Sequence, residues 1–139
     1  MRPARPTANL ARSLPTVGAM GELCPIFASV EIIGTKWRLM VVRHLMKGPM
    51  RYNELLRANP GLNAKTLSST LKFLELARVL ERRVLTDRPV QVVYSLTVDG
   101  RALAPVIEEF RLWGERRVLP RWERRDPQLR ELFEGKTLQ

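Results

Sequence analysis

Hydrophobic residues recur every three or four positions through two stretches near the start of the chain, which is the period of an α-helix. Pro25 suits the first turn of the first helix, where its missing N–H costs nothing, and Gly34 interrupts that helix. Thr35 is a natural N-cap for the second helix, which carries Trp37 as an expected core residue. The pattern therefore predicts two consecutive helices that end before the Gly-Pro pair at 48–49.

The next two amphipathic stretches, Tyr52–Ala58 and Asn63–Ala77, are separated by the turn-forming run Asn-Pro-Gly. Asn63 is placed to cap the second of these helices, because its side chain can accept from a backbone N–H of the first turn. The buried stripe of that helix follows i, i+4, i+7 spacing: Leu67, Leu71 and Leu74. Its opposite face carries short hydroxyl side chains and two lysines: Lys65, Thr66, Ser68, Ser69 and Lys72.

The pattern then changes to the alternation that is typical of strands. Val79–Leu85 and Val90–Leu96 are predicted to pair as a β-hairpin around a turn at residues 86–89, where Arg88 is the main cation. Two helices and a helix-turn-helix pair followed by a hairpin are the element order of a winged helix-turn-helix. We therefore expect a mainly α fold with a small β-hairpin, in the α+β class.

The last third of the chain returns to helical spacing. Thr97 is expected to cap a long helix in which Pro105 causes a kink, and Pro120 is expected to end it. A short helix over Pro127–Glu134 follows. The long helix has an apolar stripe that a domain of this size cannot bury alone: Leu103, Val106 or Ile107, Phe110, Trp113 and Val118.

The charge balance favours a polyanionic partner. The 139 residues include 24 Lys and Arg against 14 Asp and Glu, a formal net charge of +10. Nineteen of the basic residues are Arg, whose planar guanidinium suits phosphate and guanine, so nucleic acid is favoured over an anionic membrane surface. We expect one domain over residues 23–114, a mobile basic arm over 1–22 and a helical extension over 115–139. The arm either is simply disordered or touches DNA.

Several other functions are not supported by the composition. The single cysteine, Cys24, excludes an intrachain disulfide, and one histidine without clustered thiols gives no metal site, so we expect no metal and no cofactor. No nucleophile–base pair or phosphate-binding loop is present, so we do not expect an enzyme. The apolar runs are too short for a membrane span and the N-terminus lacks a signal-peptide core, so we expect a cytoplasmic protein without a membrane partner.

The chain resembles the HxlR-type family of winged helix-turn-helix transcriptional regulators, which are relatives of the MarR regulators. The resemblance covers about two-thirds of the chain, from Cys24 to Gly114. Its motifs, in order, are Cys24-Pro25, Ile33-Gly34-Thr35-Lys36-Trp37, Gly48-Pro49, Arg51-Tyr52-Asn53-Glu54-Leu55, Lys65-Thr66-Leu67-Ser68, Glu81-Arg82, Val92-Val93-Tyr94-Ser95-Leu96-Thr97, Gly100 and Trp113-Gly114. Each motif alone is weak, but their order and spacing together are specific.

The resemblance implies a homodimer that binds double-stranded DNA at an inverted-repeat operator, without a catalytic centre. The expected DNA-binding residues are Arg51, Asn53, Lys65, Thr66, Ser68, Ser69, Lys72 and Arg88. Those at the start of the second helix of the pair are expected to read bases, while Lys72, Arg51 and Arg88 hold phosphate. The expected dimer interface comprises Ile26, Val30, Leu103, Ile107, Phe110, Trp113 and Val118.

Two questions stay open at this stage. Some family members use a cysteine at the place of Cys24 as a redox or electrophile sensor, which makes a redox or small-molecule effector one alternative and ordinary packing the other. The chain also departs from the family, since Arg78 replaces a usual Gly, and apolar Phe73 and Leu76 replace charged residues. These two residues would be exposed on a lone winged helix, so we expect a partner surface or the C-terminal tail to cover them. These apolar residues leave a second function open, a winged-helix protein–protein interaction module without specific DNA binding.

Overall fold

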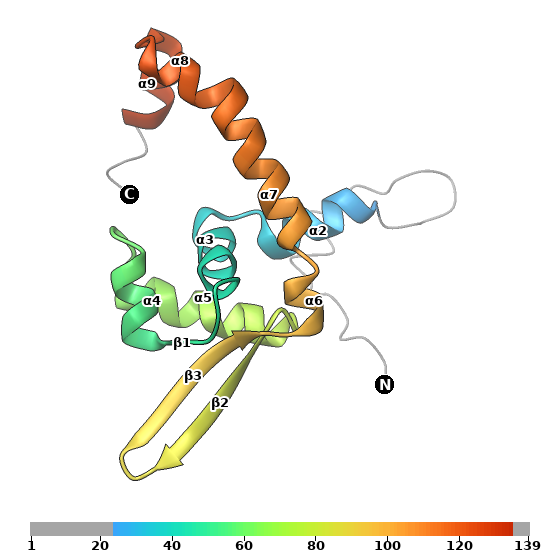
Figure 1. Ribbon diagram of the computed structural model, residues 1–139, viewed down its shortest axis with the longest axis vertical. Coiled ribbons are helices and arrows are strands. Elements are labelled where there is room, and N and C mark those ends of the chain that lie inside the picture. Colours follow the sequence, from blue (N-terminus) through green and yellow to red (C-terminus); the bar gives the residue numbers. More distant parts are fainter. Residues whose placement is uncertain (1–23, 135–139) are drawn as a thin grey trace. The chain divides into compact units, whose positions relative to one another are not determined.

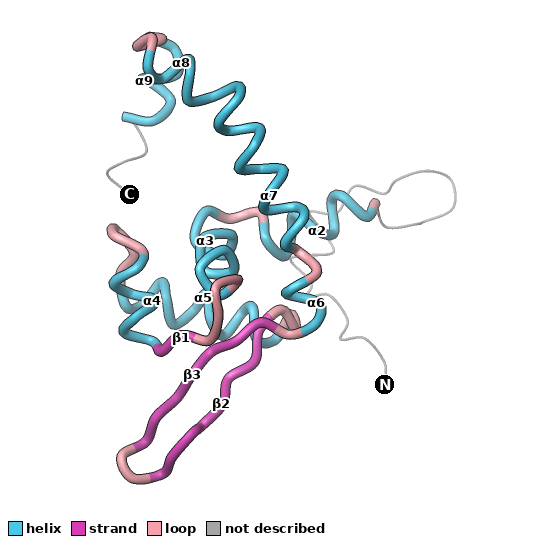
Figure 2. Tube along the Cα trace, in the orientation of Figure 1, coloured by secondary structure: helices cyan, strands magenta, loops and turns pink. Residues whose placement is uncertain are grey.

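The computed structural model describes residues 24–134, which divide into two compact units at Arg101 (Figures 1 and 2). The arm predicted over residues 1–22 lies outside the described residues. The division at Arg101 falls earlier in the chain than the domain boundary expected at residue 114. Each unit is described separately below.

The first unit has the predicted order of helices and strands. Its elements are α2 (Pro25–Ile33), α3 (Lys36–Leu45), β1 (Met50–Arg51), α4 (Tyr52–Ala58), α5 (Ala64–Leu76), β2 (Leu80–Asp87), β3 (Val90–Leu96) and α6 (Val98–Arg101). The core lies between α3, α4, α5 and the inner ends of β2 and β3. Its most deeply buried side chains are Val41, Val42, Leu55, Leu67, Leu74 and Leu80.

Local signals set the ends of these helices as predicted. Pro25 occupies the first turn of α2, and Gly34 ends the helix by donating its N–H to the Val30 carbonyl at 2.7 Å. Thr35 caps α3 by accepting from the Arg38 N–H at 3.4 Å. Trp37 was expected in the core, but it is only half-buried in the first turn of α3.

The helix-turn-helix pair is confirmed in detail. The Asn63 side chain accepts from the Thr66 N–H at 2.8 Å and so satisfies one of the unpaired N–H groups at the start of α5. The three leucines of the predicted stripe are buried: Leu67, Leu71 and Leu74. Burying this stripe fixes the rotation of α5 about its axis and leaves the polar face outward.

Helix α5 ends with Arg78 in the left-handed region at φ 60°. The Arg78 N–H donates to the Glu75 carbonyl at 3.0 Å and the Val79 N–H to the Leu74 carbonyl at 2.9 Å, which is the bonding pattern of a Schellman motif. The helix therefore stops in the geometry that normally favours glycine, although a side chain occupies the position.

The three strands form an antiparallel sheet in the order β1-β3-β2, and β2 and β3 extend from it as the wing hairpin (Figure 1). We predicted a turn over residues 86–89, but Thr86 pairs with Gln91 and Asp87 with Val90, so the loop contains only Arg88 and Pro89. A bulge at Leu85 shifts the register and allows this late pairing. At the base of the hairpin, α6 approaches so closely that a Cβ on Gly100 would lie 2.0 Å from the Val79 carbonyl oxygen.

The second unit consists of α7 (Ala104–Trp113), a π-helical segment η1 (Gly114–Val118), α8 (Leu119–Glu123) and α9 (Pro127–Glu134). The predicted single long helix is wrong at both prolines. Pro105 does not kink a helix but lies in the first turn of α7, after the break that follows α6. Pro120 does not end the helix, because it lies in the first turn of α8, where the lack of an N–H costs little.

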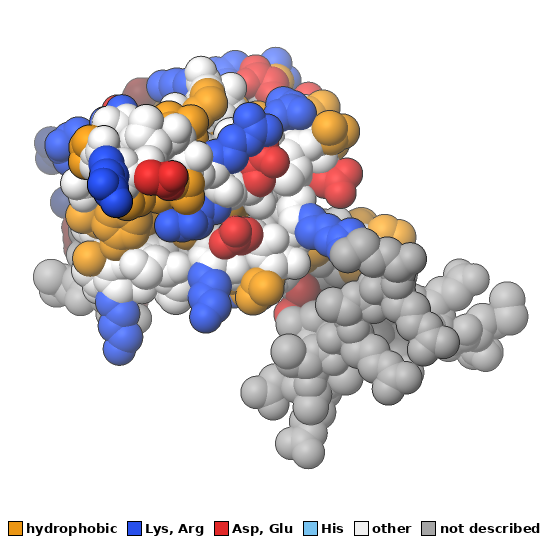
Figure 3. Space-filling view, turned by 90° about the horizontal axis from the view of Figure 1, so that it is seen from below, with side chains coloured by type: hydrophobic (Ala, Val, Ile, Leu, Met, Phe, Trp, Pro, Cys, Tyr) orange, Lys and Arg blue, Asp and Glu red, His pale blue; other side chains and the backbone are white. Residues whose placement is uncertain are grey.

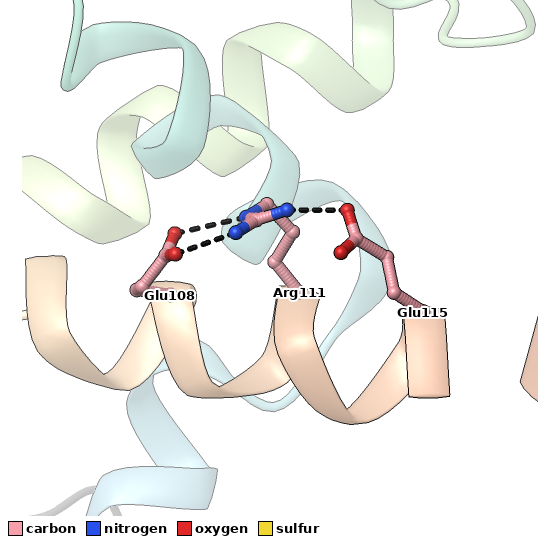
Figure 4. Close-up of polar contacts among 3 residues, drawn as sticks. All are labelled: Glu108, Arg111 and Glu115. Atoms are coloured by element: carbon pink, nitrogen blue, oxygen red, sulfur yellow. Dashed lines mark hydrogen bonds and ion pairs between the residues drawn. The ribbon is translucent and has the colours of Figure 1, made fainter. Parts of the chain in front are cut away.

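Polar contacts organise the surface of the second unit. Arg111 donates to both carboxylate oxygens of Glu108, at 3.0 and 2.7 Å, and also bonds Glu115 (Figure 4). These bonds lower the pKa of Glu108 and raise that of Arg111. Helical spacing places this polar ladder opposite the apolar residues of α7. The charged side chains on one face of α7 are therefore paired with each other, whereas the apolar side chains on the opposite face remain exposed.

A small apolar contact joins α8 to α9. The Trp122 and Phe133 rings meet edge to face with centroids 5.7 Å apart, and Leu129 is buried. Asp126 caps α9 by accepting from the Leu129 N–H at 3.3 Å, and the Arg121 guanidinium lies 2.9 Å from the other carboxylate oxygen. These contacts make the two short helices one local structure.

Candidate nucleic-acid interface

The exposed face of α5 presents the predicted base-reading residues on one surface. Lys65, Ser68, Ser69 and Lys72 are exposed, and Thr66 is half-buried. They face away from the leucine stripe, so the packing of α5 directs them outward. The helix N-terminus also has a partial positive charge, which favours an anion beside its first turn.

The hydroxyl groups of this face are oriented by contacts within the protein. Tyr52 donates its hydroxyl to the Ala64 carbonyl at 2.8 Å, and its oxygen lies 3.1 Å from the Ser68 hydroxyl. Ser69 donates to the Thr66 carbonyl at 3.0 Å. Sequence reasoning missed the role of Tyr52, which connects the first helix of the pair to the second. The two lysines supply the long cationic side chains of the face.

Arg51 links the helix-turn-helix to the wing hairpin. Its guanidinium donates to the Gln91 side-chain oxygen at 2.9 Å, while its backbone N–H donates to the Glu54 carboxylate at 2.7 Å. Its backbone pairs with Val93 in the sheet. Gln91, for which the sequence offered no role, thus positions Arg51. Asn53 is exposed in the first turn of α4.

The wing hairpin carries more cations than we predicted. Arg88 is exposed at the tip as expected, and Arg82 and Arg83 are exposed along β2. Arg83 pairs with Glu81 at 3.0 Å, which partly neutralises it. Lys and Arg side chains are prominent on the surface seen in Figure 3, with hydrophobic patches between them. The Glu-Arg-Arg run was a signal for these cations that the sequence analysis left unused.

Phe73 is half-buried, and its cover comes from α3 of the same unit instead of the tail or the partner surface that we expected. The Arg38 guanidinium lies over its ring at 3.4 Å from the centroid, and the same group donates to the Glu31 carbonyl at 3.1 Å. Burial lowers the pKa of Arg38, and the nearby Glu31 opposes that shift. Arg38 therefore joins the end of α2 to α5 and covers Phe73. Leu76 is exposed.

Cys24 is half-buried at the start of α2, and its carbonyl accepts from the Ala28 N–H at 3.0 Å. Within residues 24–134, no group of three His, Cys, Asp or Glu side chains is arranged to hold a metal ion. Over the same residues, no helix has the length and apolar character needed to cross a bilayer.

The predicted interface residues differ in exposure. Phe110 and Trp113 are exposed on α7 and line a shallow hollow of about 600 Å³ together with Pro105, Val106 and Glu109. Ile26 and Val30 are exposed on α2. Half-buried positions complete the set: Leu103, Ile107 and Val118.

These elements define a winged helix-turn-helix, in which α4 and α5 form the helix pair and β2 and β3 form the wing. The family model of HxlR-like helix-turn-helix proteins matches residues 32–121. The chain therefore belongs to the HxlR-like family and is a transcriptional regulator.

Similar proteins agree with this assignment. The uncharacterized HTH-type transcriptional regulator YvaP of Bacillus subtilis is 39% identical over 100 residues, which are 71% of this chain and 93% of YvaP. The HTH-type transcriptional regulator YodB of the same organism is 36% identical over 94 residues, which are 67% and 84% of the two chains.

Solved structures agree as well. A MarR-family transcriptional regulator from Porphyromonas gingivalis W83 superimposes with a TM-score of 0.65 at 34% identity, over 68% of this chain and 93% of that one. Reduced YodB superimposes with a TM-score of 0.62 at 35% identity, over 71% and 98%. These relatives are matched over nearly their full length, whereas about 30% of this chain lies beyond the match.

Proposed function

We propose that the protein regulates transcription as a homodimer on an inverted-repeat operator, with α5 of each copy in a major groove. The observation that carries this proposal is the exposed face of α5, where two lysines and two hydroxyl side chains lie beside the wing hairpin of the same unit. Lysine donates to guanine O6 and N7, and hydroxyls bond base edges or phosphate. The relatives are named as transcriptional regulators, which gives no support to a protein–protein module without specific DNA binding.

The residues divide by position into two roles. Lys65, Thr66, Ser68 and Ser69 lie in the first turns of α5 and select sequence. The second group holds phosphate and consists of Arg51, Asn53, Lys72 and Arg88. Because Arg51 bonds Gln91 of β3, it also connects the start of α4 to the wing hairpin.

The test is a titration of a duplex that the wild-type protein selects from a random pool, compared with an unselected duplex at several salt concentrations. Lys65→Ala should cost about 1–3 kcal/mol at one base pair of each half-site and relax specificity there. Arg88→Ala should weaken both duplexes alike and lower the salt slope by about one unit per subunit. Lys47→Ala removes an exposed charge outside the proposed surface and serves as the control.

The assignment of roles is wrong if Arg88→Ala changes sequence preference and leaves the salt slope untouched. Specific DNA binding itself is disproved if the wild-type protein selects no sequence and binds no duplex in a salt-dependent way. The protein–protein module then becomes the better explanation.

We also propose that an effector modulates DNA binding through Cys24. Support comes from solved structures of quinone-bound and diamide-treated YodB and from the oxidised and reduced forms of the redox regulator HypR. Diamide should change the affinity of the wild-type protein for its selected duplex, and Cys24→Ser should remove that response while keeping basal binding. Equal responses would make Cys24 an ordinary packed thiol.

Two further proposals follow from the family. The protein acts in the cytoplasm and carries no catalytic activity of its own. Membership of a family of transcriptional regulators supports both proposals.

A further inference from the structure

The tip of the wing hairpin is apolar and carries one acid and one cation, Asp87 and Arg88. Val84, Leu85 and Val90 are 49, 55 and 66% exposed, and all three lie near the Arg88-Pro89 loop. Contact with phosphate alone would be served by polar and charged side chains. Three exposed aliphatic residues at one end of a narrow ribbon indicate that something apolar covers them.

The tip is a preformed structure. Leu85 occupies a bulge, since Val84 pairs with Val92 and Thr86 with Gln91, so Leu85 has no partner across the hairpin. Bulges of this kind redirect a side chain. The Thr86 hydroxyl donates to the Pro89 carbonyl at 2.6 Å and braces the loop. A rigid tip presents its apolar side chains without a large loss of entropy on binding.

The position of the tip and the exposed arginines of the hairpin point to DNA. The strand rises about 3.3 Å per residue, so β2 carries its tip about 23 Å beyond Leu80. That reach exceeds the width of the major groove, which is about 12 Å. If α5 lies in a major groove, the hairpin therefore reaches past the sugar-phosphate backbone at the edge of that groove to the adjacent minor groove. Arg82 and Arg88, which are exposed on the wing hairpin, complement the phosphates that flank that groove.

We propose that Leu85 and Val90 form an apolar wedge that enters the minor groove beside each half-site and bends the operator. This inference rests on the proposed DNA-binding function. The undistorted minor groove, about 6 Å wide, does not admit a two-stranded ribbon, so the groove must open for the tip to enter. Aliphatic side chains placed against base steps partly unstack them and kink DNA toward the major groove.

The wedge adds specificity at positions without base hydrogen bonds. Pyrimidine–purine steps such as TA unstack easily, whereas A-tracts are stiff. The selected operator should therefore carry a flexible step at each flank, one minor groove away from the bases that α5 reads. Replacing that step with an A-tract should weaken binding.

The experiment uses the full chain and a duplex that it selects, with fluorophores at both ends to report bending by energy transfer. The test variants are Leu85→Ser and Val90→Thr, and the matched control is Val98→Thr, since Val98 is 74% exposed on α6, outside the wing hairpin. Each single variant should bind about tenfold more weakly, because loss of one buried aliphatic side chain is worth about that factor, and the double variant should bind more weakly still. It should also bend DNA less and lose its preference for the TA flank, with an unchanged salt slope.

The control variant should bind and bend the duplex like the wild type. If the wedge variants do so too, the wedge is disproved, and the apolar tip is then a contact for a protein. If the wild-type protein binds no duplex, the proposed function fails first. If the wild-type protein binds the duplex but energy transfer in the complex equals that of free DNA, only the bending proposal is overturned.

Discussion

Arg78, just after the C-terminus of α5, adopts a backbone conformation that is unfavourable for residues with a side chain. At φ 60° its Cβ approaches the following carbonyl, which costs an L-residue roughly 1–2 kcal/mol. The Schellman bonds of Arg78 and Val79 and the burial of Leu74 and Val79 hold the turn in place. This strain lies at the junction between α5 and the wing hairpin, the two elements proposed to contact DNA.

Replacing Arg78 should show how much of this strain is released. Arg78→Gly and Arg78→Ala both remove the arginine side chain with all its contacts, but only glycine removes the Cβ. The glycine variant should exceed the alanine variant in free energy of unfolding by about 1 kcal/mol, measured by urea denaturation. Equal stabilities would mean that the turn relaxes and carries no strain.

His44 should make stability depend on pH. Its pKa is lowered from 6.5, mainly by burial and then by Arg43 and Lys47, and its Nε2 has no hydrogen-bond partner. The folded chain therefore favours the neutral ring, and the unfolded state binds more protons as pH falls through about 6.5. The free energy of unfolding should decrease from pH 7.5 to pH 5.5.

His44 is the only histidine, so a single variant isolates this effect. Urea denaturation at several pH values compares the wild type with His44→Gln. The free energy of unfolding attributable to His44 should decrease toward acid pH in the wild type and not in the variant. If both proteins lose stability equally over this range, His44 is not its cause.

At the scale of the element, Asn63 joins the stability of α5 to its proposed contact with DNA. Its side chain caps the helix at the end that would meet phosphate. Asn63→Ala should lower the free energy of unfolding by about 1 kcal/mol. Asn63→Asp should keep the cap, because a carboxylate also accepts from the Thr66 N–H, but should weaken binding to the selected duplex by repelling phosphate.

Urea denaturation and duplex titration of the two variants separate the roles. Asn53→Asp adds the same charge at a proposed phosphate contact on α4 without altering the α5 cap, so it should weaken DNA binding and leave the free energy of unfolding unchanged. Full DNA affinity in Asn63→Asp would place the phosphates away from the start of α5.

The elements that the sequence predicted well are those with local signals. Thr35 and Asn63 cap helices through residues three positions away, and the leucine stripe of α5 follows from spacing alone. Pro105 and Pro120 misled the prediction, because a proline that suits a first turn resembles one that breaks a helix. The π-helical segment between them carries no residue pattern that distinguishes it from an α-helix.

Contacts that join distant residues were not predictable from pattern. Tyr52 meets Ser68 across 16 positions, Arg51 meets Gln91 across 40, and the cover over Phe73 comes from Arg38. Each depends on how packed helices bring side chains together. The exposed face of α5 was nonetheless predicted correctly, because the buried stripe determines which residues remain outside.

At the scale of the whole molecule, exposed aromatic residues on α7 predict self-association. Phe110 and Trp113 border an apolar hollow, and burying large aromatic side chains stabilises an interface strongly. Ile26 and Val30 of α2 offer further apolar surface. A second copy of the chain is the proposed partner, because closed two-fold symmetry uses the same patch twice.

Phe110→Asp and Trp113→Asp should convert the dimer to monomers in sedimentation at micromolar concentration, since each places two carboxylates in the interface. Val98→Asp puts the same charge on an exposed apolar position of α6 and should remain dimeric. A wild-type chain that sediments as a monomer would disprove the proposed assembly. An operator with two half-sites would then require another explanation.

The π-helical segment gives this interface an unexpected geometry. In η1 the Leu119 N–H donates to the Gly114 carbonyl, five residues back, so one extra residue is accommodated without breaking the rod. Because a π turn closes over five residues, we expect Trp113 and Val118 on the same side, whereas a regular helix would turn them to different sides. Deleting one residue within Gly114–Val118 should thus convert the π turn to a regular helical turn and keep the apolar interface residues on one side. The same deletion inside α7 would rotate the residues after it relative to those before it.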